Sequence, residues 1–550
     1  MMKIETRAAS SVKHPHGLAL LSDPARNKGT AFTLEERERY GLVGLLPDAV
    51  EDIDRQAQRV LAHLETKKTD LGRYIYLVGL CDRNETLFYR VVMSDPKRFL
   101  PIIYAPTVGE ACRKFGHIFR QPRGMYLSIR HKGRVKEILS RWPETDVRFI
   151  CVSTGGRILG LGDLGANGMG IPIGKLQVYT ACAGIPPHGL LPLLLDIGTT
   201  NQDLIDDPLY LGTRQAPPDD ADLDAFVEEF VAAVQDLFPR CCIHFEDWKG
   251  TDAIRMLARY RDKVLCYNDD IQGTAATALA GLASASAIKG SKLRDERILF
   301  LGAGSAGLGI ADMIVTAMTR EGLTREEARA RVWMADVNGL LHSGRNDLSP
   351  AQAVYAHPHA PAINLAEIVA AVKPTALIGV STAGGAFNEG VIRAMAALNQ
   401  RPVIFALSNP TEKAECTAEQ AYRWSDGRAL FAAGVQFADV DLGGRVLTPG
   451  QANNFYIFPA VALAVYATEA RLITDDVFVE AARALAAQVT PEQRARGLLF
   501  PPQENILAVE IATATEVARH IFAAGLARVP EPEDLDAWIA GMTYSPDYAS

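Results

Sequence analysis

Residues 298–307 read Ile298-Leu299-Phe300-Leu301-Gly302-Ala303-Gly304-Ser305-Ala306-Gly307. The four apolar residues predict a short buried strand. The glycines follow in the spacing Gly-x-Gly-x-x-Gly, just before a helical pattern that begins at Ala306. In that setting the backbone amides and the N-terminus of the helix can hold a pyrophosphate. The stretch therefore predicts a dinucleotide-binding loop. A tight strand-to-helix turn without a ligand is the alternative.

The residues around this loop continue the alternation of strand and helix. Five apolar runs predict strands, and helical patterns separate most of them. The runs are 298–301, 332–334, 376–380, 403–407 and 430–432. Continuously apolar strands that alternate with helices are typical of a doubly wound parallel sheet. Asp336 ends the second strand, where an acidic residue would bind ribose hydroxyls, although the interval from the loop is longer than the usual ~20 residues.

A second glycine loop competes with the first. Residues 160–165 also have the spacing Gly-x-Gly-x-x-Gly and also follow a predicted strand. Gly168, Gly170 and Pro172 delay any helix, and no acidic residue ends a recognisable following strand. We therefore interpret residues 160–165 as a close-packed loop of an active site, and residues 302–307 as the dinucleotide site.

Two acidic clusters lie twenty-two residues apart, Phe245-Glu246-Asp247 and Asn268-Asp269-Asp270. Each cluster has two neighbouring carboxylates, which repel each other unless a cation or a proton lies between them. Each also follows an apolar stretch, so we expect both at strand ends that face a cleft. The pattern indicates a divalent metal held by oxygen ligands beside a dinucleotide. Solvated acidic pairs on surface loops are the alternative.

The remainder of the chain divides into regions that differ in their predicted secondary structure. Residues 34–120 predict helices separated by proline or polar breaks. From Val147 on, apolar runs and glycines predict a second α/β region, and after Asn454 the pattern is helical again. We expect an α/β protein with four parts: a helical N-terminal region (1–121), a discontinuous α/β substrate and metal domain (122–268 with 455–526), a Rossmann-type NAD domain (269–454) and a C-terminal tail (527–550).

The bulk composition excludes several classes of protein. The 550 residues carry a net charge of −8, which argues against a nucleic-acid partner. Eight cysteines without a Cys-x-x-Cys pair fit a reducing compartment and no zinc cluster. The N-terminus has no sustained apolar stretch, and the most apolar window, 275–288, is shorter than the about 20 residues that span a bilayer. We expect a soluble cytoplasmic protein with no membrane partner.

In their order, the motifs resemble those of the large malic enzyme family, and the match runs from Asn27 to at least Pro459. Beside the acidic clusters, its landmarks are Tyr104-Ala105-Pro106-Thr107-Val108-Gly109, Arg157-Ile158-Leu159-Gly160-Leu161-Gly162-Asp163, Gly168-Met169-Gly170-Ile171-Pro172-Ile173-Gly174-Lys175-Leu176, Ser408-Asn409-Pro410-Thr411 and Asn453-Asn454. The chain also departs from the family pattern. Thr154-Gly155-Gly156 replaces the usual Asp-Gly-Glu, Tyr267 stands where Phe is common, and Ala452 and Ala460 replace common glycines. None of these changes removes a catalytic group, but the loop before Arg157 is expected to be tuned differently.

The resemblance implies roles for the charged residues. Three carboxylates would ligate Mg²⁺ or Mn²⁺, namely Glu246, Asp247 and Asp270. Lys175 would be the general base, paired with Asp269. Its pKa would have to fall, and burial, Arg157 and the metal would each push it down. Tyr104 would protonate the enolpyruvate. Without the family match, a core tyrosine and a solvated lysine would be the safer interpretations.

The resemblance also implies the residues that bind substrate and cofactor. Arg157 would clamp a substrate carboxylate, and Asn409 and Asn454, with Asn453 as a less certain neighbour, would bond substrate or nicotinamide. Turn formation is the alternative for the asparagines. The cofactor would contact Gly302, Ala303, Gly304, Ser305, Ala306, Gly307, Asp336 and Asn409. NAD is favoured for two reasons. Asp336 would repel a 2′-phosphate. NADP-preferring members of the family place a lysine further along this segment, and this sequence has none between Asp336 and Ala353. Arg345 could still meet that phosphate, so NADP is the alternative.

The sequence therefore predicts a metal-dependent, NAD-linked malic enzyme. It would convert L-malate to pyruvate and carbon dioxide, could also decarboxylate oxaloacetate, and would form a homodimer or homotetramer. One alternative is a malolactic enzyme, which keeps NAD bound and yields lactate. A catalytically silent metabolite-binding regulator is another. Glu51, Arg59 and Arg83 fall where some family members carry a fumarate-responsive site, with surface ion pairing as the alternative.

Overall fold

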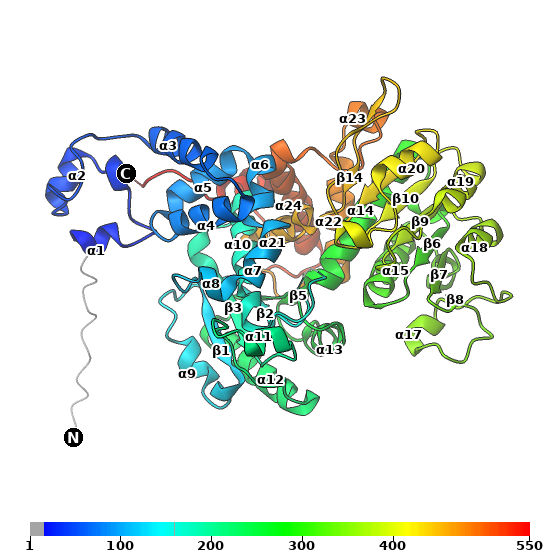
Figure 1. Cartoon of the computed structure of the whole chain (residues 1–550), viewed down its shortest axis with the longest axis horizontal. Coiled ribbons are helices and arrows are strands. Elements are labelled where there is room, and N and C mark those ends of the chain that lie inside the picture. Colours follow the sequence, from blue (N-terminus) through cyan, green and yellow to red (C-terminus); the bar gives the residue numbers. More distant parts are fainter. Residues whose placement is uncertain (1–15, 159, 550) are drawn as a thin grey trace. The chain divides into compact units, whose positions relative to one another are not determined.

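A computed structural model describes residues 16–158 and 160–549. Residues 1–15, where no secretion signal is expected, lie outside the described residues, as do Leu159 of the second glycine loop and Ser550. The chain forms two compact units (Figure 1). The first unit combines residues 1–103 with residues 545–550, and the second unit spans Tyr104–Tyr544.

The first unit is helical, as predicted. Its helices are α1 (Leu18–Leu21), α2 (Leu34–Arg39), α3 (Ile53–Glu65), α4 (Asp70–Cys81), α5 (Glu85–Ser94) and α6 (Pro96–Ile103). The N-cap residues of α3, α4 and α5 are Asp52, Thr69 and Asn84. The side chain of each accepts a hydrogen bond from an amide of the first turn. Leu64 and Phe88 have no exposed surface and belong to the core of this unit.

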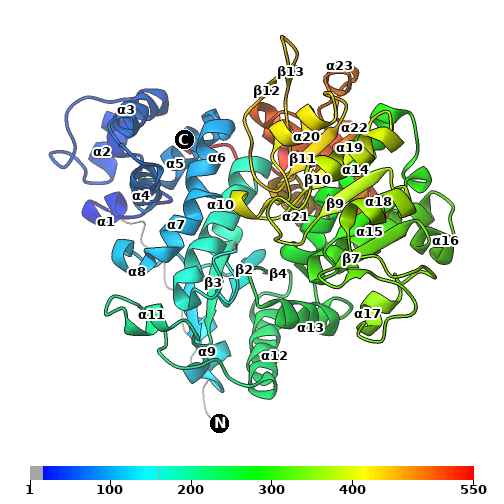
Figure 2. The ribbon, with the colours of Figure 1, turned by 45° about the vertical axis from the view of Figure 1, so that its right-hand side comes forward.

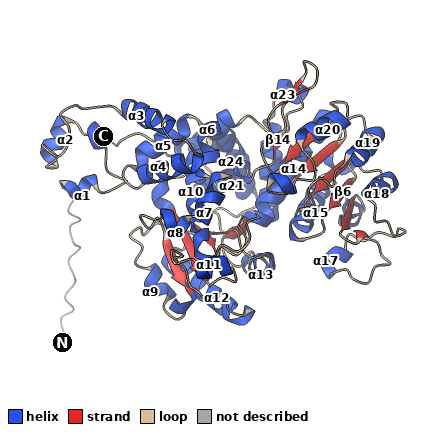
Figure 3. Ribbon diagram, viewed as in Figure 1, coloured by secondary structure: helices blue, strands red, loops and turns tan. Residues whose placement is uncertain are grey.

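The described part of the second unit contains two large sheets and a small two-stranded one, and the two large sheets appear as separate groups of red strands in Figure 3. The first sheet has five strands in the order β1-β3-β2-β4-β5, and all its pairs are parallel. Its strands are β1 (Met125–Ser128), β2 (Phe149–Ser153), β3 (Leu190–Asp196), β4 (Cys242–Phe245) and β5 (Cys266–Asn268). Its helices are α7 (Thr107–Arg113), α8 (Phe115–Ile118), α9 (Val135–Leu139), α10 (Gly170–Ala183), α11 (Gln202–Asp206), α12 (Asp220–Leu237) and α13 (Gly250–Tyr260). This is the predicted second α/β region.

The second sheet has seven strands in the order β14-β11-β10-β9-β6-β7-β8. Its strands are β6 (Ile298–Leu301), β7 (Val332–Asp336), β8 (Gly339–Leu340), β9 (Ala376–Gly379), β10 (Val403–Ala406), β11 (Leu430–Ala433) and β14 (Gly450–Gln451). The pairs are parallel except for β7 with β8. All five predicted strands are confirmed. Because β6 lies between β7 and β9, the strand order reverses at β6, which is where doubly wound sheets bind their ligands.

Helices cover both faces of the seven-stranded sheet (Figure 2). One face packs α18, α19 and α20 through a core that includes Leu377, Ile404 and Phe431. The helices of this region are α15 (Ser305–Arg320), α16 (Arg325–Arg329), α17 (Pro350–Ala353), α18 (Leu365–Val372), α19 (Glu389–Leu398) and α20 (Ala418–Trp424). A small hairpin of β12 (Val440–Asp441) and β13 (Val446–Leu447) follows β11. The doubly wound architecture predicted from the sequence is confirmed.

A bundle of helices joins the two sheets. Its members are α14 (Thr274–Lys289), α21 (Phe458–Thr468), α22 (Asp475–Ala487), α23 (Pro491–Ala495) and α24 (Ile506–Ala523). The α21 and α24 helices pack on α10, and α14 packs on α15 and α22. The helical span Asp269–Lys289 is long and apolar enough to cross a membrane, but 72% of its most apolar window is buried, as in a core helix.

The C-terminal tail differs from the expectation. Residues 535–541 form helix α25 (Leu535–Gly541), and Asp534 caps it by accepting a hydrogen bond from the Ala537 amide at 2.9 Å. Ile539 is fully buried, and α25 packs on α21 and α24. A helix this short is marginally stable on its own, so the burial of its apolar side chains against α21 and α24 stabilises it.

Candidate active site

Both acidic clusters lie at the carboxyl ends of neighbouring parallel strands. Phe245, the last residue of β4, pairs with Asn268, the last residue of β5. The carboxylates that follow each strand are therefore brought to the same edge of the sheet. Glu246 is 3% exposed, Asp247 is 5% exposed and Asp269 is fully buried. The expectation of strand ends is confirmed, and solvated surface pairs are excluded.

Lys175 lies in the middle of this group of carboxylates. It projects from α10, whose residues are all buried, and its Nζ is 2.9 Å from Glu246 Oε1 and also forms an ion pair with Asp269 Oδ2. The ammonium lies 4.2 Å from the ring centroid of Phe458 and 5.4 Å from that of Tyr104. The sequence prediction that Lys175 pairs with Asp269 is confirmed.

The electrostatic environment of Lys175 differs from the expectation. Burial lowers the pKa of Lys175, but the charges of Asp269 and Glu246 outweigh burial and raise it well above its ordinary value. These carboxylates act against the lowered pKa that the sequence analysis expects for a base, and the effect of a bound metal on that pKa stays a prediction. The neighbours of Lys175 are carboxylates, which stabilise the charged amine. Burial raises the pKa of Tyr104 well above its ordinary value, which keeps the phenol protonated and able to donate.

Asp269 begins a π-helical turn, η5 (Asp269–Gly273), which the sequence analysis missed. A Cβ atom on Gly273 would lie 1.8 Å from Asp269 Oδ1, so the turn needs a residue without a side chain there. Asn454 donates from Nδ2 to Asp269 Oδ2 at 2.9 Å and to the Asp269 carbonyl oxygen at 3.2 Å. Gly273 and Asn454 together fix the carboxylate that faces Lys175. Single-turn π-helices are frequent at functional sites.

The predicted metal ligands have the chemistry that Mg²⁺ and Mn²⁺ require. Glu246, Asp247 and Asp270 offer only oxygen atoms, and Asp270 Oδ2 accepts a hydrogen bond from the Asp247 amide at 2.8 Å. Asp247 has a φ of 54°, a strained conformation for a residue with a side chain. Burial and neighbouring negative charge raise the pKa values of Glu246 and Asp270. A divalent cation would relieve that repulsion, so the residues present fit the metal.

A second set of metal-type ligands surrounds the same point. The ligand atoms of His244, Glu246 and Asp269 all lie within 4.8 Å of one another. This set shares only Glu246 with the predicted ligands. Lys175 already contacts Glu246 and Asp269, so its ammonium supplies the positive charge of this cluster. Burial lowers the pKa of His244 to about 3, so its imidazole is neutral.

Arg157 connects the acidic cluster to the dinucleotide loop. Its amide donates to the Asp247 carbonyl oxygen at 3.4 Å. A Cβ atom on Gly250 would lie 3.4 Å from Arg157 Nη1 and 3.6 Å from Ser305 Oγ, so these two side chains flank the same point. The expected substrate arginine and the expected pyrophosphate loop therefore border one region of the second unit.

The dinucleotide loop lies at the reversal of strand order beside β6. Gly302 has a φ of 115°, and a Cβ atom there would lie 2.6 Å from the Val380 carbonyl oxygen. A Cβ atom on Gly304 would meet nothing within 4 Å, so the fold does not need that glycine. At the end of β7 the Asp336 carboxylate accepts two hydrogen bonds of 2.9 Å from Arg345. The guanidinium also pairs with Asp347 at 2.6 Å.

The second glycine loop is close-packed at Gly160 and Gly165, as expected, whereas a Cβ atom on Gly162 would meet nothing within 4 Å. A Cβ atom on Gly155 would lie 2.0 Å from the Gly165 carbonyl oxygen, and one on Gly160 would lie 3.3 Å from the Asn409 carbonyl oxygen. A 3₁₀ turn over Gly165–Met169 separates the loop from α10, which begins at Gly170, so the helix starts later than at the first loop, where α15 begins at Ser305. Asn453 accepts a hydrogen bond from the Phe455 amide at 3.2 Å, which is turn chemistry.

The expected effector residues belong to the first unit. Arg59 forms an ion pair with Glu51, and Thr30 donates to the other oxygen of Glu51 at 2.6 Å. Burial raises the pKa of the Tyr76 phenol, while the charges of Arg83 and Arg59 oppose that rise. Arg59 and Glu51 thus form one ion pair, and the role of Glu51, Arg59 and Arg83 stays a prediction.

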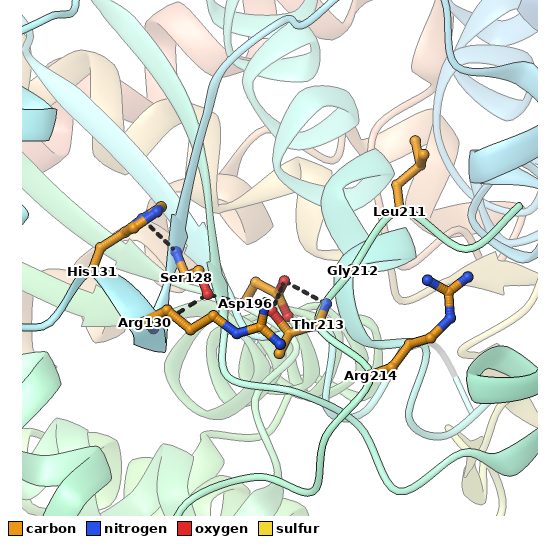
Figure 4. A pocket seen from close by; sticks show the side chains of 8 residues that line it. All are labelled: Ser128, Arg130, His131, Asp196, Leu211, Gly212, Thr213 and Arg214. Atoms are coloured by element: carbon orange, nitrogen blue, oxygen red, sulfur yellow. Dashed lines mark hydrogen bonds between the residues drawn. The ribbon is translucent and has the colours of Figure 1, made fainter.

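A pocket of about 340 Å³ lies at the ends of β1 and β3 (Figure 4). It is lined by Ser128, Arg130, His131, Asp196, Leu211, Gly212, Thr213 and Arg214. Asp196 Oδ2 accepts hydrogen bonds from the Thr213 amide at 2.8 Å and the Thr213 hydroxyl at 2.7 Å. The pocket shares no lining residue with the predicted site.

Comparison with known proteins identifies relatives over nearly the whole chain. Residues 81–261 match the family described as "Malic enzyme, N-terminal domain", and residues 271–522 match "Malic enzyme, NAD binding domain". The NADP-dependent malic enzyme of Columba livia is 48% identical, with 97% of this chain and 96% of the relative covered. The NADP-dependent malic enzyme of Homo sapiens is 47% identical, with 97% and 94% covered.

Solved structures of similar fold agree with these matches. A malic enzyme from Pyrococcus horikoshii aligns with a TM-score of 0.55 at 23% identity, covering 81% of this chain and 89% of that one. The malic enzyme of Entamoeba histolytica aligns with the same TM-score and identity, covering 91% and 90%. At this identity the likeness concerns the fold alone, and it supports the arrangement of two α/β regions.

Proposed function

The chain belongs to the malic enzyme family, and from that premise we propose that it converts L-malate to pyruvate and carbon dioxide with NADP as the hydride acceptor. Relatives that are 45% to 48% identical carry the name NADP-dependent malic enzyme. They favour NADP, the alternative from the sequence, over the main prediction of NAD. The proposed metal is Mg²⁺ or Mn²⁺.

The observation that carries this proposal is the buried ion pair of Lys175 with Asp269, which Glu246 and the ring of Tyr104 border. A buried lysine is costly unless its charge is neutralised, as Asp269 and Glu246 do here, and a buried, charge-paired titratable group is a candidate for proton transfer. Tyr104 is the proton donor of the proposal, and the centroid of its ring lies 5.4 Å from the Lys175 ammonium. Lys175 and Tyr104 therefore place a proton acceptor and a proton donor of the proposal close to each other.

The residues divide the proposed reaction between them. Lys175 accepts the proton of the C2 hydroxyl as hydride leaves C2, and Arg157 holds a substrate carboxylate. After the bond between C3 and C4 breaks, Tyr104 donates a proton to C3 of the enol to give pyruvate. Bound NADP supplies the hydride acceptor. Glu246, Asp247 and Asp270 would hold a divalent ion, which would supply a Lewis acid and oppose the effect of the carboxylates on Lys175.

The end of β7 supports the NADP proposal physically. A bare Asp336 carboxylate would repel a 2′-phosphate. Arg345 neutralises Asp336 through a bidentate pair, and its side chain is 9% exposed. We propose that the guanidinium exchanges Asp347 for the 2′-phosphate, because Arg binds phosphate through the same planar fork.

One assay separates this proposal from its rivals. The protein is given L-malate and Mn²⁺ with either NADP or NAD, and both the reduced dinucleotide and the organic acid product are measured. We expect pyruvate and NADPH in equal amounts, with a higher kcat/KM for NADP than for NAD. Faster turnover with NAD would restore the first prediction. Lactate without net reduced dinucleotide would identify a malolactic enzyme, and no turnover would favour a binding protein.

We also propose that Arg59 and Arg83, with Glu51, bind fumarate and activate the enzyme, and that the enzyme is a cytoplasmic homodimer or homotetramer. Guanidinium groups bind carboxylates through a bidentate fork, which supports a dianion site at Arg59 and Arg83. The rate at low malate should rise with fumarate in the unmodified protein and not in Arg59→Ala. An unchanged rate in both proteins would leave Glu51 and Arg59 as a surface ion pair. Light scattering gives the oligomer size.

A further inference from the structure

A second layer of polar residues lies directly behind the catalytic cluster. His244 precedes Glu246 by two residues in β4, and Tyr267 precedes Asp269 by two residues at β5. Alternate residues of a strand point to the same face. Tyr179 follows Lys175 by four residues in α10, which places both on one face of that helix. Each member of the front layer, Glu246, Asp269 and Lys175, therefore has a partner behind it.

The back layer forms one connected network. His244 and Tyr267 are paired in the register of β4 and β5, and their rings stack with centroids 4.5 Å apart. His244 Nδ1 lies 2.9 Å from the Tyr179 hydroxyl and 3.0 Å from the Tyr267 hydroxyl, and the two hydroxyls also bond each other. All three residues are fully buried. The other ring nitrogen, Nε2, lies 2.9 Å from Glu246 Oε2.

The donors and acceptors of this network can be assigned from its end. A carboxylate that pairs with Lys175 only accepts, so His244 Nε2–H must be the donor to Glu246. Nδ1 then has one lone pair, which accepts from one tyrosine hydroxyl. The second hydroxyl donates to the first. Every proton thus has an acceptor, and the chain runs from the tyrosines through His244 to Glu246.

We propose that His244 is a positioning residue that fixes the Glu246 carboxylate, and that Tyr179 and Tyr267 fix the tautomer of His244. The inference rests on the proposed function, because Glu246 is expected to be a metal ligand there. One oxygen of Glu246 is held by His244 and the other contacts Lys175, so the plane of the carboxylate is set from both sides. Groups that orient metal ligands in this way contribute ~10–100-fold to metal affinity.

The tyrosine pair predicts a redundancy. Tyr267 stands where Phe is common in the family. Without its hydroxyl, the Tyr179 hydroxyl would still lie 2.9 Å from His244 Nδ1. One hydroxyl is enough to hold the tautomer, so the loss of either one should matter less than the loss of both. A glutamine at position 244 would also preserve the network. Its amide nitrogen can donate to Glu246 while its carbonyl oxygen accepts from a tyrosine.

The test is Mn²⁺ binding by the full chain without malate or dinucleotide, measured from the electron paramagnetic resonance signal of free Mn²⁺. His244→Leu should raise the Kd for Mn²⁺ by ~10–100-fold. His244→Gln and Tyr267→Phe should each raise it by less than about threefold. The double variant Tyr179→Phe/Tyr267→Phe should raise it by more than either single tyrosine variant. Folding of each variant is checked by circular dichroism.

Two outcomes would overturn the inference. The first is His244→Leu binding Mn²⁺ as tightly as the unmodified protein. The second is His244→Gln losing as much affinity for Mn²⁺ as His244→Leu. If position 244 acted only by packing, keeping a hydrogen-bond donor there would make no difference. If His244→Leu does not fold, the comparison of the double tyrosine variant with Tyr267→Phe decides, and equal affinities would refute the chain. Failure of the unmodified protein to bind Mn²⁺ or to turn over malate would instead contradict the proposed function.

Discussion

Lys175 is the residue on which the proposed chemistry depends. Its amine is enclosed by Glu246, Asp269 and the ring of Phe458, and it is 2% exposed. Lys175→Ala should lower kcat for malate oxidation by ~10²–10⁴-fold, since the proton of the C2 hydroxyl loses its acceptor. Steady-state kinetics with saturating Mn²⁺ measure this. Lys132→Ala, which removes an exposed lysine paired with Asp222, is the matched control. Full turnover by Lys175→Ala would require another base.

Gly273 controls Lys175 indirectly, through Asp269. A methyl group on Gly273 would lie 1.8 Å from Asp269 Oδ1 and 2.7 Å from its Cγ atom. The carboxylate cannot move away without leaving Lys175 and Asn454. Gly273→Ala should therefore lower kcat by ~10²-fold, as small misplacements near reacting groups do. Kinetics are compared with Gly541→Ala, where a methyl group would meet nothing within 4 Å. Equal kcat values would show that the π-turn absorbs the methyl group.

At the scale of elements, the glycines of the loop between β6 and α15 differ in what they are needed for, folding or binding. Gly302 and Gly307 are needed by the fold, because a Cβ atom would lie 2.6 Å and 2.3 Å, respectively, from backbone oxygens. Gly304 faces open space. Gly304→Ala should keep the melting temperature and raise the KM for the dinucleotide by about tenfold, because the methyl group would meet the pyrophosphate.

The matched comparison for Gly304→Ala is Gly302→Ala. That change should lower the melting temperature of the ligand-free protein, because φ at Gly302 is 115° and the Val380 carbonyl blocks the methyl group. Calorimetry and dinucleotide kinetics on both variants test the distinction. If Gly304→Ala binds the dinucleotide normally, the pyrophosphate does not lie over this loop.

The edge of the seven-stranded sheet contains a pH-sensitive contact. His357 stacks on Trp333 with centroids 4.0 Å apart, and its Nε2 lies 2.8 Å from the Val332 carbonyl oxygen. Burial lowers the pKa of His357, although the Val332 carbonyl opposes this. Because the unfolded chain takes up the proton first, this stabilisation is present above the unfolded pKa of about 6.5 and is lost as pH falls below it.

His357→Phe keeps the stacked ring but does not titrate. Between about pH 7.5 and about pH 5.5, the melting temperature of the unmodified protein should therefore fall further than that of the variant. Scanning calorimetry across this range measures the difference. His359→Phe serves as the control, since His359 lies against the same Trp333 but its Nδ1 bonds the carbonyl oxygen of the next residue, Ala360. Parallel curves for the unmodified protein and His357→Phe would remove His357 from the acid response.

The sequence predicts elements best where the pattern is local. Strands buried on both faces, such as Ile298–Leu301 and Val403–Ala406, are continuous apolar runs, and glycine spacing identifies the loop beside them. Helix α25 and the two-residue strands could not be predicted in this way. They are too short to carry a period, and tertiary packing decides whether they form.

The site was predicted in part for similar reasons. Carboxylates after two strands converge because parallel strands end at one edge, so Glu246 and Asp269 follow from pattern alone. The direction of the Lys175 pKa depends on which charges lie nearest in space, and those come from separate parts of the chain, at Tyr104, Glu246 and Asp269. The network of His244, Tyr179 and Tyr267 was also missed. Its signal is a spacing of two residues in each strand and four in the helix, read only after the elements are known.

At the scale of the whole molecule, the end of the chain returns to its beginning. Residues 545–550, part of the C-terminal tail predicted over 527–550, belong to the first unit with residues 1–103. The Tyr548 hydroxyl donates to Gln56 Oε1 at 2.6 Å and accepts from Asn84 Nδ2 at 2.7 Å. Gln56 lies in α3, and Asn84 caps α5. One side chain near the C-terminus thus joins two helices of the N-terminal unit.

Tyr548→Phe removes both of these hydrogen bonds and keeps the ring. Unpaired, partly buried polar groups cost about 1 kcal/mol or more, so local opening of α3 and α5 should become easier by roughly fivefold. Hydrogen exchange read by mass spectrometry should show faster exchange in residues 53–65 and 85–94, with α14 unchanged. Tyr126→Phe is the matched control, because the buried Tyr126 hydroxyl has no hydrogen-bond partner among the described residues. Unchanged exchange in α3 and α5 would mean that the C-terminal residues rest on the first unit without stabilising it.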